Sequence, residues 1–469
     1  MPANVIPFRY TLRDDQLPKQ WYNLRAHLPE KPAGLRLPDG SEARFSNLQP
    51  ILCDALIRQE FDTETPWVHI PSGVQNMYKL YRPTPLCRAR HLEEELGTPA
   101  RIYYKFEGNS TSGSHKLNSA VAQAYYGKEQ GITTLATETG SGQWGTALSE
   151  AAAHYGLDCN VFMVRSSYDR KPARRSIMQT FGSTVTASPS NATNAGRHAL
   201  SVDPFAPGSL GTAISEAVET ALNVPENKGR YQLGSVLNEV MLHQSIIGLE
   251  AYAVMEELEE YPDVIIGCVG GGSNFGGLIS PFVRDKLQGR HTETRFVAAE
   301  PTAVPTLTRG RFAYDYVDAG HICPLCKMYT LGADFVPNPL HVSGLAFHGM
   351  NPVVSQLYHE GLVEAVAIEQ LEAFQSATLF SKLETILPAA ESSYAVHAAI
   401  QEAKACIETG QRKTILFCLT GTGYFDMEAY EMFNHGSMVN HVPTEEELQA
   451  SFAGIPALPG IQQAGGLPL

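Results

Sequence analysis

An excess of positive charge and a long unbroken apolar run are both missing from this sequence. Its 469 residues carry a formal net charge of −14, which argues against a nucleic-acid groove or an anionic membrane surface as partner. The amino-terminal stretch MPANVIPFRYTLRDDQLPKQ has no apolar segment long enough for a signal peptide, and the most apolar stretch, VIIGCVGGGSNFGGLI, is interrupted by glycine. We therefore expect a cytoplasmic protein with no membrane and no nucleic-acid partner.

A complete set of zinc ligands is also missing. HICPLCKM, residues 321–328, resembles half of a zinc site, but no second pair follows at a suitable spacing, so we expect no metal site there. The eight cysteines are scattered along the chain. Three of them fall inside strand-like apolar runs, where a reduced and buried thiol is the usual state: Cys159, Cys268 and Cys418.

The chain divides into an irregular start and two alternating series. Residues 1–80 contain prolines and no repeat, and we expect them to form an amino-terminal extension. From about residue 100, the strand-like segments RIYYKFE, TTLATET, CNVFMV and STVTAS alternate with helix-like ones; DVIIGCVG, RFVAAEP and KTILFCLTG form a second series. Such alternation indicates parallel sheets with helices on both faces. The sequence predicts an α/β fold with two doubly wound parallel-sheet domains, residues 81–245 and 246–469.

One connection in the second series is long. Residues 302–365 carry few regular patterns. Loops of this length in compact proteins are usually lids or binding segments, so we expect this connection to serve the functional site.

Lys116 is the single formally charged residue between Asn109 and Gly127. It stands where a turn of small residues gives way to a helix without charge on any face, which indicates a helix packed inside the protein. The helix dipole and desolvation both disfavour the ammonium form and so lower the lysine pKa. A lysine of lowered pKa can form a Schiff base with a carbonyl substrate or with pyridoxal phosphate, whereas one that extends to solvent has no such role.

Two glycine turns follow predicted strand ends, where open α/β sheets bind their ligands. ETGSGQWG, residues 138–145, fits the dinucleotide pattern, but the acidic residue expected after the next strand is missing, and Arg165 there would suit NADP instead. GCVGGGSNFGG, residues 267–277, places backbone N–H groups and side-chain donors at a helix start, which predicts an anion nest for a phosphate. The lysine of a nucleotide-hydrolysing loop is absent there, which argues against ATP.

A third turn, LTGTG, closes the last predicted strand and would present the hydroxyl of Thr420 at the carboxyl edge of the sheet. Taken alone, that hydroxyl would cap the following turn. A Schiff-base lysine, a phosphate nest and a neutral hydroxyl are together the parts needed to hold pyridoxal phosphate.

These motifs carry a specific resemblance. YRPTPLCRARHLEEELG, GSHKLNSA, TETGSGQWG, GCVGGGSNFGG and PAAESS resemble, in order, the motifs of the tryptophan synthase beta chains, a family of fold type II pyridoxal-phosphate enzymes. The amino-terminal extension with RQEF, LGSVLNEVMLHQSIIGLEA and TLGADFVPNPLHVSGLAFHGM resembles the longer second branch, so that the resemblance covers nearly the whole chain. It implies a lyase of tryptophan biosynthesis that holds pyridoxal 5'-phosphate, leaves room for a monovalent cation, acts on small molecules and forms a homodimer, with or without an alpha-type subunit.

The resemblance also implies roles by position. Lys116 would hold the cofactor as a Schiff base, Glu138 would be the acid/base carboxylate, and Asp334 would contact the side chain of serine in the closed state. Without the resemblance, Glu138 would be interpreted as a surface glutamate at a strand end. The other implied cofactor contacts are His115, Asn118, Gly270, Gly271, Gly272, Ser273, Asn274, Glu391 and Thr420. The implied loop around the substrate carboxylate is Thr139, Gly140, Ser141, Gly142 and Gln143.

The reaction that the resemblance implies is a β-replacement. Thr420 would meet the pyridine nitrogen, and because a hydroxyl cannot stabilise a protonated ring as a carboxylate does, the ring would favour loss of a β-substituent. L-serine, or O-phosphoserine, would lose that substituent with the help of Lys116 and leave an aminoacrylate. Indole would then add while Glu138 manages the proton that leaves its ring, which gives L-tryptophan.

Three departures from the family pattern surround the predicted site. Leu117 stands where proline is usual, Ser141 stands where alanine is usual, and LTGTGYF replaces a sequence like LSGHGHF. These departures affect which substrates fit the site more than they affect the reaction type. A phenol-like or thiol nucleophile in place of indole therefore stays an alternative. Deamination of serine or threonine, which needs no Glu138, also stays open, as do a non-catalytic binding protein of the same fold and an NADP-dependent dehydrogenase.

Overall fold

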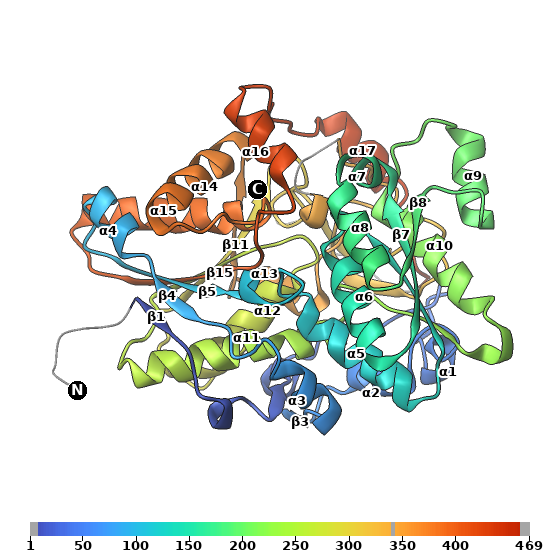
Figure 1. Cartoon of the computed structure of the whole chain (residues 1–469), viewed down its shortest axis with the longest axis horizontal. Coiled ribbons are helices and arrows are strands. Elements are labelled where there is room, and N and C mark those ends of the chain that lie inside the picture. The colour runs from blue at the N-terminus through green and yellow to red at the C-terminus, as the bar shows by residue number, and fades with distance from the viewer. Residues whose placement is uncertain (1–7, 339–342, 460–469) are drawn as a thin grey trace.

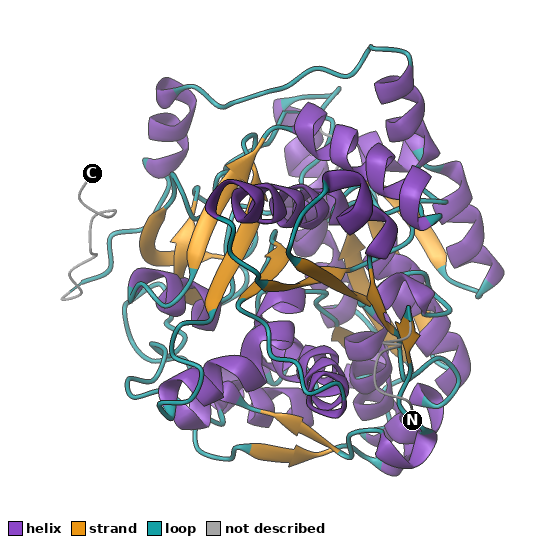
Figure 2. Ribbon diagram, turned by 90° about the vertical axis from the view of Figure 1, so that its left-hand side faces the viewer, coloured by secondary structure: helices purple, strands orange, loops and turns teal. Residues whose placement is uncertain are grey.

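Two main sheets organise the computed structural model, which describes residues 8–338 and 343–459 (Figures 1 and 2). The seven-stranded sheet holds, in spatial order, β1 (Arg9–Tyr10), β4 (Leu86–Arg88), β5 (Arg101–Phe106), β15 (Thr414–Leu419), β10 (Val264–Cys268), β11 (Arg295–Pro301) and β14 (Glu364–Ile368). The four-stranded sheet holds β8 (Thr184–Ser188), β7 (Asp158–Val164), β6 (Thr134–Thr139) and β9 (Gly229–Tyr231).

The strand directions confirm the α/β fold with parallel sheets. All strands of the smaller sheet run parallel, as do β5, β15, β10, β11 and β14 of the larger one. The short strands β1 and β4 are antiparallel additions at one edge of the larger sheet.

Helices cover both faces of the larger sheet because its central strands are apolar on both sides. Ile265 and Leu416 belong to the cluster that contains residues of α11 (Asn238–Glu257) and α12 (Ser273–Leu287). Their neighbours Ile266 and Phe417 point the other way, into the cluster with α14 (Gln370–Glu384) and α15 (Ser392–Thr409). Figure 1 shows these two helix layers on opposite sides of β15 and β11.

The smaller sheet is covered in the same manner. Leu135 and Val161 pack with α5 (Leu117–Glu129) and α6 (Gln143–Tyr155). Ala136 and Phe162, one residue further along their strands, pack with α10 (Leu210–Leu222) on the opposite face. The predicted helix after Lys116 is thus confirmed as a buried element.

The remaining elements are short. They are η1 (Asp14–Gln16), β2 (Gln20–Tyr22), η2 (Leu24–His27), α1 (Phe45–Leu48), α2 (Asp54–Phe61), β3 (Trp67–His69), α3 (Ser72–Tyr78), α4 (Arg90–Leu96), η3 (Glu107–Asn109), α7 (Arg165–Arg170), α8 (Pro172–Thr180), α9 (Asn194–Val202), η4 (Pro225–Asn227), β12 (Arg311–Tyr316), β13 (Leu325–Thr330), η5 (Ser343–Leu345), α13 (Pro352–His359), α16 (Met427–Asn434) and α17 (Glu445–Phe452). Strands β2 and β3 form one antiparallel pair, and β12 and β13 form another.

Two features differ from the expected organisation. The strand over RIYYKFE was expected to open the first series, but as β5 it pairs with β15 near the other end of the chain. The connection over 302–365 was expected to be largely irregular, yet it contains β12, β13 and α13. The division of the chain into domains at residues 80 and 245 stays a prediction. Among the helices of residues 8–338 and 343–459, none is long and apolar enough to cross a membrane.

Candidate active site

Lys116 lies between the two sheets, at the residue before α5. Its side chain lines two adjoining cavities, one at the carboxyl end of the smaller sheet and one at the carboxyl end of the larger sheet. Desolvation lowers the pKa of its amine, while the charges of Glu391 and Glu138 act in the opposite direction. The lowered lysine pKa expected from the sequence is confirmed, and its acidic neighbours come from distant parts of the chain.

The two cavities have different chemical character. Both are lined by Lys116, Ser235 and Gly344. The first, called the acid/base cavity, is also lined by Glu138, Thr139, Gly140, Ser141, Trp144, Leu210, Ile214, Leu233, Gly234 and Phe347. The second, called the glycine-loop cavity, is also lined by His115, Gln143, Cys268, Gly270, Gly271, Gly272, Ser273, Asn274, Leu345, Glu391 and Thr420. The structure therefore brings together most of the residues predicted from the sequence.

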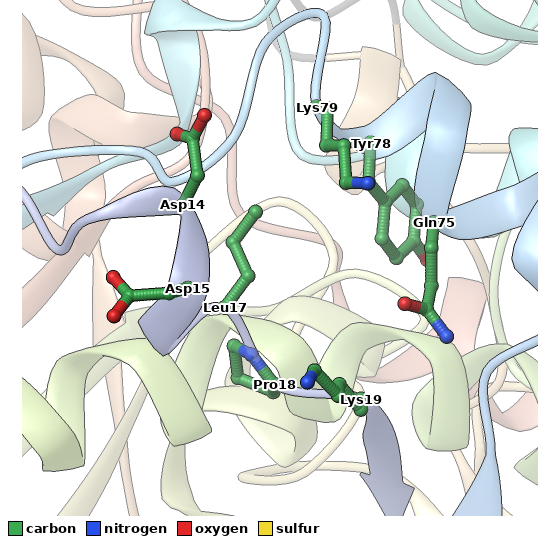
Figure 3. A pocket seen from close by; sticks show the side chains of 8 residues that line it. All are labelled: Asp14, Asp15, Leu17, Pro18, Lys19, Gln75, Tyr78 and Lys79. Carbon is green, nitrogen blue, oxygen red and sulfur yellow. The ribbon is translucent and has the colours of Figure 1, made fainter.

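A larger surface cavity, of about 370 Å³, lies elsewhere, beside the amino-terminal segment (Figure 3). Its lining is Asp14, Asp15, Leu17, Pro18, Lys19, Gln75, Tyr78 and Lys79. None of these is a predicted site residue, and the two aspartates and two lysines of the lining are exposed to solvent. Chemistry therefore points to the smaller cavities around Lys116.

Glu138 is placed by the smaller sheet. It is the second-last residue of β6, and its side chain is only 5% exposed. Burial raises the pKa of its carboxyl to about 7, although the hydrogen bond from Tyr231 opposes that shift. A carboxyl with this pKa can take up and release a proton near neutral pH.

The glycine loop follows β10 and leads into α12. Gly272 has a φ of 83°, in the left-handed region that favours glycine. A Cβ on Gly270 would lie 2.8 Å from Cα of Leu345, and one on Gly271 would lie 2.3 Å from Oγ of Ser235. The glycines thus allow two other segments to close over the loop.

The glycine-loop cavity fits the phosphate and ring of pyridoxal phosphate. Ser273 and Asn274 start α12, where unpaired backbone N–H groups attract an anion. The Asn274 amide donates to the Cys268 carbonyl at 2.8 Å, which leaves the backbone N–H groups of the helix start as donors for an anion. The Thr420 hydroxyl lies 2.8 Å from that of Ser392, so a ring nitrogen beside it would meet a neutral group. Lys116 in the same cavity supplies the amine.

His115 supports the last strand rather than carrying charge. Its backbone N–H donates to the carbonyl of Thr420 at 2.9 Å. Burial lowers the pKa of the ring to about 3, with the charge of Lys116 acting in the same direction. The ring is therefore neutral at physiological pH.

The predicted carboxylate loop connects both cavities. Gly142, with a φ of 94°, precedes α6, whose first residue is Gln143. The Gln143 amide donates to Oε2 of Glu391 at 2.8 Å, and the backbone N–H of Gly344 donates to Oε1 of the same carboxyl at 3.1 Å. Burial raises the pKa of Glu391, with the nearby charge of Asp426 in support. Glu391 thus joins α15, the loop and η5 at the edge of the site.

Three predicted residues, Gly142, Asn118 and Asp334, do not line either cavity. The Asn118 side chain bonds to Arg82 at 2.7 Å and to Glu107 at 3.1 Å in a buried polar network. Asp334 lines a separate cavity together with Asn338 and Ser451. The roles of these three residues as cofactor and substrate contacts stay predictions.

Several lining residues were missed from the sequence. Ser235 follows β9, which is three residues long and too short to show a strand pattern. Gly344 lies in the long connection over 302–365, and Trp144 is the second residue of α6, where an aromatic side chain is usually part of the core. The rule that ligands bind at strand ends would have found Ser235 if β9 had been recognised.

The side chains around the zinc-like pattern at residues 321–328 and around Arg165 are arranged for packing rather than for binding zinc or NADP. Cys323 and Cys326 are buried, and the His321 ring stacks on Tyr316 at 4.0 Å. Over residues 8–338 and 343–459, no group of three or more histidine, cysteine or acidic side chains could hold a metal. Arg165, which NADP would require, donates to the backbone carbonyl of Pro189. All eight cysteines are free and buried, as expected for Cys159, Cys268 and Cys418.

Comparison with known proteins agrees with this chemistry. Residues 77–421 match the family model described as "Pyridoxal-phosphate dependent enzyme". An L-serine ammonia-lyase from the fungus Rhizomucor miehei has a TM-score of 0.55 at 18% identity, covering 76% of this chain and 99% of its own. Maize serine racemase has a TM-score of 0.52 at 15% identity, covering 77% of this chain and 96% of its own. The fold and the site thus define a pyridoxal-phosphate-dependent enzyme of fold type II.

Relatives of much higher identity narrow this class. The chain is 52% identical to tryptophan synthase beta chain 2 of Thermotoga maritima, over 89% of this chain and 98% of the relative. It is 50% identical to tryptophan synthase beta chain 2 of Aquifex aeolicus, over 92% and 100%, and 50% identical to tryptophan synthase beta chain of Thermococcus gammatolerans, over 92% and 98%. The chain belongs to the tryptophan synthase beta chain family.

Proposed function

We propose that this chain catalyses a pyridoxal-phosphate-dependent β-replacement in which L-serine, or O-phosphoserine, and indole give L-tryptophan. The observation that carries the proposal is that Lys116 and Glu138 line the same cavity. The names of the relatives support the substrates, and the lyase class follows from the family.

Different residues around Lys116 would carry out proton removal and substrate binding in the first half-reaction. When bound, pyridoxal phosphate supplies the electron sink for breaking the bond between the α-carbon of the amino acid and its hydrogen. Lys116, freed from the cofactor, would take that proton because its pKa is lowered. The loop from Thr139 to Gln143, which ends at the start of α6, would bind the substrate carboxylate.

Glu138 would act in the second half-reaction. It lines the cavity next to an apolar wall formed by Trp144, Leu210, Ile214, Leu233 and Phe347. Such a wall suits a flat aromatic nucleophile, while the carboxylate would accept the proton that the nucleophile loses.

Deamination of serine is the second candidate. The fungal neighbour carries that activity in its name, but at 18% identity the likeness concerns the fold alone. A deaminase needs no second organic substrate, so the apolar wall beside Glu138 favours the β-replacement.

The assembly and location are proposed from the family resemblance. We infer a cytoplasmic homodimer with a monovalent cation near the site, and an alpha-type subunit as the partner that could deliver indole. Light scattering of the purified chain, with and without added alpha-type subunit, measures both assembly states. A monomer that gains nothing in mass would contradict both.

The Glu138→Ala substitution tests the proposed function. We expect loss of the β-substituent from serine, measured as pyruvate release without indole, to be unchanged. Formation of tryptophan should fall by about 10²–10⁴-fold, the usual worth of a positioned acid or base. Glu129→Ala, on the exposed end of α5, is the control and should behave as the parent does. If Glu138→Ala leaves tryptophan formation intact, Glu138 does not have this role.

A further inference from the structure

The carboxyl of Glu138 has a partner on a second strand. Strand β9 pairs with β6 in a register that places Tyr231 opposite Ala136. Side chains two residues apart on a strand share a face, so Glu138 lies on the same face as Ala136 and diagonally across from Tyr231. The Tyr231 hydroxyl donates a hydrogen bond of 2.6 Å to Oε2 of Glu138. The register of two strands therefore fixes this contact.

The contact is shielded from water on the side away from the cavity. Tyr231 is only 2% exposed, and its ring packs in the apolar cluster that includes Phe162 and Ala217. Glu138 lines the acid/base cavity, with Tyr231 behind it. In such a place the hydrogen bond cannot be replaced by water at low cost.

We propose that Tyr231 is a positioning residue for Glu138: its hydroxyl holds one carboxylate oxygen and thereby aims the carboxylate at the nucleophile and stabilises its charged form. This inference rests on the proposed function, because it concerns the group that receives the proton of the second substrate.

The other ionisable groups around the pair do not take over this role. Lys116, before α5, faces Glu138 with a charge that favours the carboxylate. Cys323 and Asp318, in the turn after β12, face Tyr231. Burial raises the pKa of the Cys323 thiol, which stays neutral, and Asp318 accepts a hydrogen bond of 3.0 Å from the Cys323 backbone. Tyr231 is thus the side chain that donates to the Glu138 carboxyl.

The proton balance is simple. As the ring carbon of the nucleophile forms its new bond, the proton that the ring loses moves to the Glu138 carboxylate, which becomes a carboxylic acid. Tyr231 keeps its own proton throughout and only donates a hydrogen bond. Since that bond favours the carboxylate, its removal should make Glu138 harder to ionise.

The test is Tyr231→Phe, which removes the hydroxyl and keeps the ring. Infrared difference spectra against pH follow the carboxylic-acid band of Glu138, which Glu138→Gln identifies by its loss. We expect the midpoint of this band in Tyr231→Phe to rise by about one pH unit, the size of one buried hydrogen bond. The acid limb of kcat/KM for indole should move up with it, while pyruvate release from serine stays unchanged.

Two controls complete the design. Tyr252→Phe removes a hydroxyl that donates to Asp285 at 2.8 Å, away from Lys116, and should shift neither midpoint. A ring-fluorinated tyrosine in place of Tyr231 is a stronger donor of the same shape, and it should move the midpoint down even if Tyr231→Phe folds poorly. An unchanged carboxyl midpoint in both Tyr231 variants overturns the inference. A parent enzyme that forms no tryptophan overturns the proposed function instead, and the infrared midpoint still decides the role of Tyr231.

Discussion

At the scale of single residues, the site depends on three ionisable groups brought together from distant parts of the chain. Lys116 precedes α5, Glu138 lies near the end of β6 and Glu391 precedes α15. Desolvation lowers the pKa of the lysine and raises the pKa of both carboxyls, so burial favours the uncharged form of each group. The Glu138 carboxyl, with a pKa of about 7, can exchange a proton near neutral pH, which is what the proposed reaction requires of it.

The pH dependence of the second half-reaction follows from Glu138. Its carboxyl has a pKa of about 7 and must be charged to accept a proton. We therefore expect kcat/KM for indole to fall as the pH is lowered through about 7, while pyruvate release from serine, which depends on Lys116, does not share this acid limb. The two rates measured across pH check this. An acid limb common to both, or one in the ordinary range of carboxyls, speaks against the assignment.

At the scale of secondary-structure elements, the site is built where strands end and helices begin. Two helices, α6 and α12, start directly after glycines with φ values of 94° and 83°. Both helix starts reach the cavities around Lys116, where they offer N–H groups and partial positive charge to anions. One start would suit the substrate carboxylate and the other the cofactor phosphate.

A substitution at the glycine loop tests this arrangement. In Gly272→Ala the new Cβ would lie 2.6 Å from Sδ of Met350, at a φ that costs a non-glycine residue about 1 kcal/mol. We expect pyridoxal phosphate to bind about tenfold more weakly, measured by titration of its absorbance, because the loop must shift. Gly289→Ala is the matched control, since Gly289 also has a positive φ, of 76°, but open space around it. Equal cofactor affinity in the two variants would contradict the role of the loop.

The sequence predicted those elements whose pattern is local. The helix after Lys116 and the glycine loop after β10 could be predicted because charge, periodicity and small residues lie within one window. Strand β9 and the pair of β12 and β13 could not be predicted. Three residues carry no period, and β12 and β13 lie in a connection whose sequence has few regular patterns. The contact between Tyr231 and Glu138 was missed with β9.

At the scale of the whole molecule, α11 connects the amino-terminal segment with both sheets. It packs against β2 and α2 of that segment, against α5, which covers the smaller sheet, and against α12, which covers the larger sheet. Glu60, in α2, accepts hydrogen bonds from the Asn238 amide at 2.9 Å and from the Glu239 backbone at 3.0 Å. The amino-terminal segment thus supplies a hydrogen-bond acceptor for the N–H groups in the first turn of α11.

Removal of this contact should reduce stability. Glu60→Ala would leave the two donors at the start of α11 without their acceptor, which costs about 1–3 kcal/mol of unfolding free energy. Denaturant unfolding of the full chain measures this loss, with Glu64→Ala, an exposed neighbour, as the control. Equal midpoints for the two variants would show that the segment does not stabilise α11 through Glu60.

The pairing of β5 with β15 also belongs to this scale. It joins residues near 101 to residues near 414, and no local pattern indicates which of several apolar strands will be neighbours. The expected assignment of RIYYKFE to the first series was wrong for this reason. Likewise, the sequence did not show that Asp334 would lie in a cavity of its own.

The measurement that tests the central claim most directly is the near-ultraviolet and visible spectrum of the purified protein with pyridoxal phosphate, before and after L-serine and then indole. We predict cofactor absorbance that depends on Lys116, changes with serine and is restored by indole as tryptophan appears. Lys116→Ala should lose this absorbance and all turnover, while Lys128→Ala, exposed at the other end of α5, should keep both. A Lys116→Ala protein with normal absorbance and turnover would contradict the central claim.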